Sequence, residues 1–303
     1  MTVTTPSTMS SESDRRLVKG AAGWHEWAPH WLPSRVAALV RRAALTRYRR
    51  TVVCQLPTGQ QFLADPSELV QCLIATTGGW EQLIFDAVEP FVPPGGTVLD
   101  VGAHVGYATV RFAGWAGPSG RVVCFEPVPS HVKQLSENLR VNGFEPRTTI
   151  VPMAVCDEEV ERDFFDSGRS NSGMGSLTGS AGHAPSRRVR TTTIDAWLAG
   201  AGVADVALTK IDVEGAEALV VGGMARTLAE GRHRAVLVEL HPGVVPDIGR
   251  DLVTLFERLG GRRYELYDWL PAGRFVPVGH GDAANYLLAV RRDSTHLLPA
   301  PPA

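Results

Sequence analysis

Residues 98–112 read VLDVGAHVGYATVRF, and this stretch decides the fold class of the chain. The first four residues continue a short apolar run that begins after Gly95-Gly96, as a buried strand does. Two glycines then turn the chain, and apolar residues continue at helical spacing. A strand that ends in a glycine turn and opens a helix begins a nucleotide-binding α/β unit, because the backbone there can approach a ligand and the helix N-terminus offers free N–H groups.

The spacing of the glycines argues against a dinucleotide site. A dinucleotide fingerprint has the pattern G-x-G-x-x-G, whereas this turn is Gly102-x-x-x-Gly106 with the bulky His104 in place of the second glycine. Asp100 precedes the turn, and a carboxylate suits the cationic end of S-adenosylmethionine better than it suits two phosphates. Glu126 follows the next expected strand, where an acid about 20 residues past the turn holds ribose hydroxyls.

Composition describes an ordinary globular chain. It has 303 residues, a formal net charge of −2, 44% hydrophobic residues and 20% charged residues. This balance allows a sizeable core and favours neither a nucleic-acid partner nor a membrane surface. Residues 1–20 lack the apolar run of a signal peptide, and no stretch is apolar enough to span a bilayer. The cysteines form no C-x-x-C pair, so we expect reduced thiols in a cytoplasmic protein.

The first part of the chain differs in character from the rest. Residues 51–64 have the alternation and central turn of a small hairpin. A basic segment at about 34–48 is interpreted as the solvated face of a helix rather than a membrane or RNA surface. The domain organisation that we expect is a disordered tail at 1–20, an N-terminal helical and hairpin extension at 21–77, a main domain at 78–292 and a tail at 293–303.

Strand and helix patterns alternate through the main domain. This alternation predicts an α/β fold with a mostly parallel sheet and helices on both faces. The expected helices are 81–91, one beginning at about 106, 129–142, one beginning after Thr193, 214–230 and 248–259. The expected strands are 97–101, 121–125, 148–151 continuing to 153–155, 206–211 and 235–238, followed by a terminal hairpin of 263–267 and 285–290.

A loop rich in Gly and Ser interrupts this alternation at residues 166–186. Loops of this length inside a compact domain are usually functional or disordered. We expect it to close over the substrate and exclude water.

Polar residues gather where the expected strands end. The carboxyl ends of the strands in an open α/β sheet form the ligand-binding edge. Carboxylates are costly to bury without partners, so acids and a histidine at the ends of several strands indicate a polar site. The residues at these positions are Asp100, Gly102, Glu126, Ala154, Asp212, Glu214, Glu239 and His241.

The sequence KIDVEGAE at residues 210–217 is the second informative motif. Alternation along the strand places Lys210 and Asp212 on one side and Ile211 on the other. Spacing of three places Glu214 and Glu217 on one face in the first turns of the next helix. A helix N-terminus favours either glutamate, but that preference does not explain a lysine and an aspartate in an apolar strand.

Together these motifs resemble the FkbM family of S-adenosylmethionine-dependent methyltransferases, over residues 78–290. The resemblance is carried by residues 98–107, Phe125-Glu126-Pro127, 210–217 and Glu239-Leu240-His241, and KIDVEGAE is its most specific part. His104 is a departure, because the family more often has asparagine there. Weaker matches are Trp80-Glu81, Asn138, Asn142, Ala154-Val155 and Thr193-Ile194-Asp195.

The resemblance implies a class I methyltransferase (Rossmann-like) fold whose sheet has seven strands, the last one antiparallel. It also implies methylation of a hydroxyl on a sugar or a secondary metabolite. The residues expected to bind the cofactor S-adenosylmethionine are Glu81, Asp100, Gly102, Ala103, His104, Gly106, Tyr107, Glu126, Pro127, Asn138, Ala154 and Asp212. Those expected to act in catalysis are Asp212, His241, Glu239, Lys210 and Glu214.

Two routes for removing the proton of an acceptor hydroxyl stay open. Asp212 and His241 are candidate bases, although His241 before Pro242 is equally explained as a strand terminator. Alternatively, Asp212 and Glu239 hold a Mg²⁺ that lowers the pKa of the hydroxyl, as in catechol-type methyltransferases. The competing hypotheses for function are an NAD-dependent oxidoreductase and a non-catalytic interaction protein on a methyltransferase scaffold.

Overall fold

The buried run at residues 97–101 forms the strand β3, and the glycine turn leads into helix α5 at Tyr107–Ala116, as the sequence predicts. In this computed structural model the described residues are 51–165, 175–178, 186–270, 273–279 and 285–299. They belong to two compact units, one ending at Glu81 and the other beginning at Gln82. The predicted domain boundaries stay a prediction. The predicted basic helix at about 34–48 and most of the 166–186 loop lie outside the described residues.

The first unit contains a hairpin and one helix. Strands β1 (Val52–Gln55) and β2 (Gln61–Ala64) pair antiparallel, which confirms the predicted hairpin. Helix α3 (Leu69–Thr77) begins after Glu68, whose side chain accepts a hydrogen bond from the backbone N–H of Gln71. This side-chain cap satisfies one of the free N–H groups of the first turn.

The second unit is built on an eight-stranded sheet with the order β12-β11-β13-β10-β9-β3-β4-β5. Strands β3, β4, β5, β9 and β10 run parallel, and β13 is antiparallel to β10 and β11. The strands, in chain order, are β3 (Thr97–Val101), β4 (Arg121–Phe125), β5 (Thr148–Val151), β9 (Val206–Ile211), β10 (His233–Glu239), β11 (Tyr264–Leu270), β12 (Arg274–Pro277) and β13 (Tyr286–Arg291).

The fold class is therefore as predicted, but the strand count is not. The expected terminal hairpin is present as the antiparallel pair β11 and β13. Strand β12 lies between them in the chain and adds an edge to the sheet through antiparallel pairing with β11. The rings of Trp269 and Phe275, opposite each other in this pair, have centroids 4.8 Å apart.

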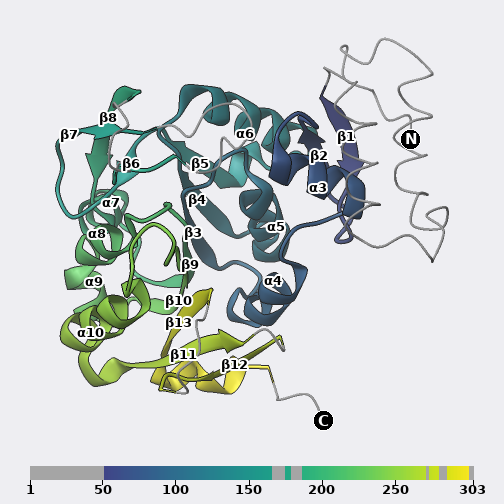
Figure 1. Cartoon of the computed structure of the whole chain (residues 1–303). Helices are drawn as coiled ribbons and strands as arrows, with labels where there is room; N and C mark the ends of the chain where they lie inside the picture. Colours follow the sequence, from purple (N-terminus) through teal and green to yellow (C-terminus); the bar gives the residue numbers. More distant parts are fainter. Residues whose placement is uncertain (1–50, 166–174, 179–185, 271–272, 280–284, 300–303) are drawn as a thin grey trace. The chain divides into compact units, whose positions relative to one another are not determined.

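Helices cover both faces of the sheet (Figure 1). One face packs against α7, α8, α9 and α10 through a core that includes Leu99, Phe125, Leu198 and Phe256. Helices α4 and α5 lie on the other side (Figure 1). The helices are α4 (Gln82–Val88), α5, α6 (Pro129–Val141), α7 (Ile194–Ala201), α8 (Glu217–Gly222), α9 (Ala225–Ala229) and α10 (Ile248–Gly260), with 3₁₀ turns at Glu89–Phe91, Glu145–Arg147, Gly261–Arg263 and Arg292–Leu297. Among the described residues, every helix is too short or too polar to cross a membrane.

The predicted continuation of the third strand to residue 155 is wrong. Pro152 has no N–H to donate to the ladder, and the N–H of Met153 turns back to the carbonyl of Val151. The chain then leaves the main sheet. Its next residues form β6 (Ala154–Val155), which joins β7 (Glu161–Phe164) and β8 (Arg187–Thr192) in a small sheet with the order β6-β8-β7.

The single helix predicted at 214–230 is also wrong, because the chain forms α8 and α9 in its place. The break falls at Gly223, where a Cβ atom would lie 2.1 Å from the carbonyl oxygen of Cys156. The helix also starts late, since Glu214 and Gly215 have φ angles of +55° and +103°. Glu214 thus belongs to the turn before the helix and not to its first turn.

Candidate active site

The turn after β3 is held against two neighbouring strands. The N–H groups of Gly102 and Ala103 donate to the carbonyl of Phe125, at 3.1 and 3.0 Å. Gly102 has a φ of +83°, and a Cβ there would lie 1.8 Å from the carbonyl oxygen of Asp212. The close approach that this glycine permits is therefore to the end of β9. As a result, the turn and the KIDVEGAE motif lie directly beside each other.

Glu126 fastens the same turn from the end of β4. Its Oε2 accepts a hydrogen bond from the N–H of His104 at 2.9 Å, and its Oε1 accepts one from the N–H of Val128 at 2.8 Å. Nδ1 of His131 lies 3.3 Å from Oε1. A carboxylate has about four lone-pair positions, so Glu126 keeps acceptor capacity for a ligand hydroxyl.

His104 contributes its backbone to this arrangement. Its φ of +49° is in the left-handed region, and its ring meets the ring of His131 edge to face with centroids 4.3 Å apart. Burial, together with the neighbouring His131, lowers the pKa of His104 to about 3. The ring is therefore neutral at neutral pH.

Asp100 is fully buried at the base of the turn. Its Oδ2 accepts a hydrogen bond from the Thr109 hydroxyl at 2.5 Å, and its Oδ1 has no hydrogen-bond partner among the described residues. Burial raises the pKa of Asp100, and the nearby Lys210 opposes that shift. Asp100 and Lys210 are paired across β3 and β9. An orphan acceptor next to a glycine turn suits a ligand that brings a donor or a positive charge.

Lys210 and Asp212 form an ion pair on one side of β9, as strand alternation predicts. Nζ of Lys210 lies 2.8 Å from Oδ2 of Asp212, and Ile211 points into the core. Burial would lower the pKa of Lys210, but the carboxylates of Asp212 and Asp100 outweigh it and raise that pKa. Burial would raise the pKa of Asp212, but Lys210 and then His241 hold it below its usual value.

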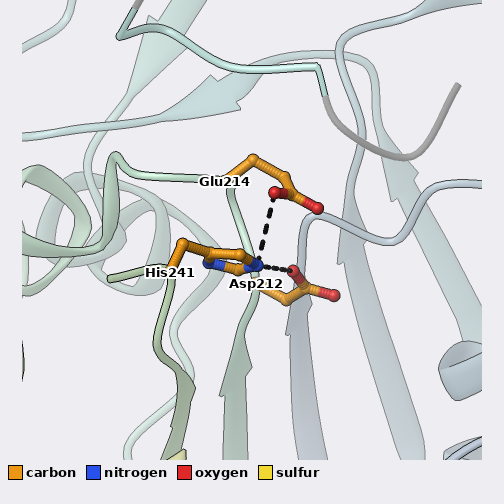
Figure 2. Close-up of side chains that lie close together, drawn as sticks. All are labelled: Asp212, Glu214 and His241. Atoms are coloured by element: carbon orange, nitrogen blue, oxygen red, sulfur yellow. Dashed lines mark ion pairs between the residues drawn. The ribbon is translucent and has the colours of Figure 1, made fainter. Parts of the chain in front are cut away.

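His241, which follows β10, is the centre of a cluster of acids. Its Nδ1 donates to Oε1 of the fully buried Glu217 at 2.9 Å. Its Nε2 lies 3.3 Å from Oε2 of Glu214 and 3.8 Å from Oδ1 of Asp212, so the two acids flank this nitrogen (Figure 2). Oε1 of Glu239 is 3.9 Å from the same nitrogen. We call Asp212, Glu214, Glu217, Glu239 and His241 the His241 cluster.

Burial and charge shift the pKa values in this cluster in opposite directions. Burial lowers the pKa of His241, but the hydrogen bond to Glu217 and the charge of Asp212 outweigh it and raise that pKa to about 9. Burial raises the pKa of Glu214 to about 7, although His241 opposes this shift. Titratable groups with strongly shifted pKa values are typical of functional sites.

The structure thus brings together most of the predicted site residues, in two adjoining groups. Asn138 supports the turn, because its Nδ2 donates to the carbonyl of Val105 at 2.8 Å. The Tyr107 hydroxyl lies 3.1 Å from Nε2 of Gln82. Ala154 belongs to the small sheet, where it packs against Val128. Ala103 is buried in the turn and Pro127 follows Glu126 directly. Glu81 ends the first unit, and its role stays a prediction.

Two further residues of the site were not among the predicted ones. Glu217 was noted only as a residue of the motif, and its burial under His241 follows from the late start of α8. His131, in the first turn of α6, carries no sequence signal, because only the path of the chain after Glu126 brings it to that carboxylate.

A described piece of the long loop contacts this site. The hydroxyl of Ser176 donates to the carbonyl of Val213 at 3.2 Å, and the backbone of Ser176 pairs with Phe165. Residues 175–178 therefore lie against the turn that carries Glu214. The predicted closure of the rest of the loop concerns residues outside the described part of the chain.

Comparison with known proteins agrees with these motifs. The model of the methyltransferase FkbM domain matches residues 100–266. The 2-O-methyltransferase NoeI of Sinorhizobium fredii is 28% identical over 153 residues, which are 46% of this chain and 61% of that protein. The chain thus covers about three fifths of the length of this relative.

Solved structures give a weaker likeness. A putative rRNA methylase from Clostridium thermocellum has a TM-score of 0.44 at 11% identity, over 67% of this chain and 89% of that one. An S-adenosylmethionine-dependent O-methyltransferase from Thermotoga maritima has a TM-score of 0.42 at 14% identity, over 82% of this chain and 80% of that one. These scores are low, so the fold assignment depends on the strand order itself.

The family match covers more than half of the chain, and the chain belongs to the FkbM family of S-adenosylmethionine-dependent methyltransferases.

Proposed function

We propose that this methyltransferase acts on a hydroxyl group of a small-molecule acceptor, a sugar or a secondary metabolite. The observation that carries the proposal is the position of the His241 cluster. A Cβ on Gly102 would collide with the carbonyl of Asp212, so the glycine turn and the titratable cluster share one edge of the sheet. A cofactor site and a set of proton acceptors are thereby adjacent.

The residues around the turn fit the methyl donor. Glu126 keeps lone pairs for the ribose hydroxyls, and charge-assisted hydrogen bonds of this kind are strong. The orphan Oδ1 of Asp100 suits the cationic methionine end. S-adenosylmethionine, when bound, supplies a methyl group that its sulfonium has already activated. Ala103, His104, Gly106 and Tyr107 complete the turn that would hold it.

The work left to the protein is to align the acceptor oxygen and to take its proton. Alignment contributes at most about 7–11 kcal/mol, and a positioned base accelerates a reaction about 10²–10⁴-fold. We assign proton removal to the His241 cluster, with Asp212 essential, because it is the group of titratable side chains beside the turn. Lys210 holds the Asp212 carboxylate in place through its 2.8 Å ion pair.

The named activity of one relative supports the choice of a hydroxyl. NoeI is named a 2-O-methyltransferase, and its match to this chain extends over 153 residues. The acceptor of this chain is still a proposal, because the chain covers only part of that protein.

The test is a methylation assay with the full-length protein. Methyl-labelled S-adenosylmethionine is incubated with a panel of hydroxylated sugars and natural products, each paired with its deoxy analogue. We expect a mass gain of one CH₂ on an acceptor and none on its deoxy partner. Label that enters nitrogen or carbon would contradict O-methylation. Binding of NADH without binding of S-adenosylhomocysteine would favour an oxidoreductase, and cofactor binding without any turnover would favour a non-catalytic role.

A further inference from the structure

The His241 cluster presents one ring nitrogen and two carboxylate oxygens toward a common point (Figure 2). These atoms are Nε2 of His241, Oδ1 of Asp212 and Oε2 of Glu214, and the three residues have ligand atoms within 4.8 Å of one another. They come from the ends of two adjacent strands, β9 and β10.

The separations from Nε2 are close to those of atoms that share one metal ion. Metal–ligand bonds of about 2.0–2.2 Å place neighbouring ligand atoms about 3–3.5 Å apart. The distances from Nε2 are 3.3 Å to Glu214 and 3.8 Å to Asp212. A shift of a few tenths of an ångström in the Asp212 carboxylate would bring its Oδ1 within that range of Nε2. Oε1 of Glu239, 3.9 Å from Nε2, is near enough to be a further ligand.

A second, buried layer of partners holds two of these ligands. Glu217 accepts the Nδ1–H of His241, which fixes the tautomer and leaves Nε2 to face the acids. Lys210 holds the other oxygen of Asp212 at 2.8 Å. Metal-binding histidines nearly always donate their other N–H to a carboxylate or carbonyl, and metal-binding carboxylates are hydrogen-bonded in the same way.

The burial of Glu217 independently indicates that the cluster accommodates an additional positive charge. Its side chain is fully buried, and its Oε2 has no hydrogen-bond partner among the described residues. A buried carboxylate is costly unless a charge nearby compensates it. Among the described residues, the cations that interact with these acids are His241 and Lys210, and they face five acids: Asp100, Asp212, Glu214, Glu217 and Glu239.

We propose that Asp212, Glu214 and His241 bind one divalent transition-metal ion, with Glu217 as the residue that positions His241. One imidazole and two carboxylates suit Mn²⁺ or Zn²⁺ better than Mg²⁺, which prefers an all-oxygen shell. This site differs from the Mg²⁺ site considered from the sequence, which would be held by Asp212 and Glu239. A bound ion would lower the pKa of the acceptor hydroxyl, and this role rests on the proposed function. The binding site itself does not depend on that function.

The test is a titration of the full-length protein with Mn²⁺ after treatment with EDTA and dialysis. The electron paramagnetic resonance signal of free Mn²⁺ falls when the ion binds. We expect one Mn²⁺ per chain, displaced by Zn²⁺ and not by a tenfold excess of Mg²⁺. Absence of saturable binding of both Mn²⁺ and Zn²⁺ would overturn the proposal, and equal competition by Mg²⁺ would overturn the choice of metal class.

Variants locate the ion. Glu214→Gln and His241→Asn should each weaken Mn²⁺ binding at least about 10-fold. Glu217→Gln should weaken it about 10–100-fold by loosening His241. The exposed His296→Gln is the matched control and should bind as the wild type does. Circular dichroism confirms that each variant is folded. Wild-type affinity in Glu214→Gln and His241→Asn alike would place the ion elsewhere and contradict the proposal.

Failure of this proposal is distinguishable from failure of the proposed function. O-methylation that is indifferent to EDTA, in a protein that does not bind Mn²⁺ or Zn²⁺, would remove the metal and keep the activity. Stoichiometric Mn²⁺ binding at these residues, without methylation of any hydroxyl, would keep the metal site and remove the activity.

Discussion

Glu217, in the first turn of α8, accepts the Nδ1–H of His241, which follows β10, at 2.9 Å. This bond joins the KIDVEGAE motif to the end of the neighbouring strand. It also orients the ring so that Nε2 faces Asp212 and Glu214. The second glutamate of the motif therefore acts through His241, while the first lies beside the nitrogen that His241 presents.

Glu126→Ala should weaken the binding of S-adenosylhomocysteine at least about tenfold. The variant loses a carboxylate that accepts charge-assisted hydrogen bonds, and it also frees the His104 N–H that now holds the turn. Isothermal titration calorimetry measures the affinity, with the exposed Glu145→Ala as the control. Equal affinity in the two variants would remove Glu126 from the cofactor site.

Gly102→Ala should destabilise the protein far more than Gly117→Ala. Both glycines have positive φ, but a Cβ at Gly102 would lie 1.8 Å from the Asp212 carbonyl oxygen, whereas a Cβ at Gly117 would have no atom within 4 Å. We expect a loss of about 1–3 kcal/mol in the free energy of unfolding for Gly117→Ala, where only the backbone conformation opposes a side chain, and a larger loss, of more than about 3 kcal/mol, for Gly102→Ala. Urea unfolding followed by tryptophan fluorescence measures both, and equal losses would show that the turn is not packed against β9.

His233 should contribute to the loss of stability in acid. Its ring is buried between the hydroxyls of Thr209 and Thr227, and burial lowers its pKa to about 3 from a usual value of 6.5. The unfolded chain then binds the proton more tightly, so this contribution is complete above about pH 6.5. It is lost as the pH falls toward 3, at up to about 1.4 kcal/mol per pH unit.

Replacement of the ring tests this dependence. In His233→Gln, the free energy of unfolding should vary less steeply between pH 6.5 and 3 than in the wild type, whatever its absolute value. The exposed His296→Gln should keep the wild-type slope. An unchanged slope in His233→Gln would mean that His233 does not titrate in this range.

The local patterns of the chain predicted the elements that build the site. The apolar run before Gly102 predicted β3, and strand alternation predicted that Lys210 and Asp212 share a side of β9. The sequence pattern also predicted that an acid, Glu126, follows β4. These predictions succeed because they depend only on periodicities within one strand or one turn.

What the sequence did not predict depends on contacts between distant segments. The break after α8 arises where Gly223 meets the carbonyl of Cys156, and Glu217 is buried because α8 starts three residues later than expected. The departure of β6 from the main sheet depends on the turn at Pro152. Strand β12 was missed because pairing at a sheet edge is set by the partner strand β11.

The most direct test of the central claim compares Asp212→Asn with the exposed Asp163→Asn in methyl transfer and in cofactor binding. Asparagine keeps the shape of the side chain and removes the charge beside His241. We predict that Asp212→Asn binds S-adenosylhomocysteine as the wild type does but methylates the acceptor at least about 10²-fold more slowly, whereas Asp163→Asn retains both properties. Near wild-type turnover by a folded Asp212→Asn variant would contradict the assignment of hydroxyl activation to the His241 cluster.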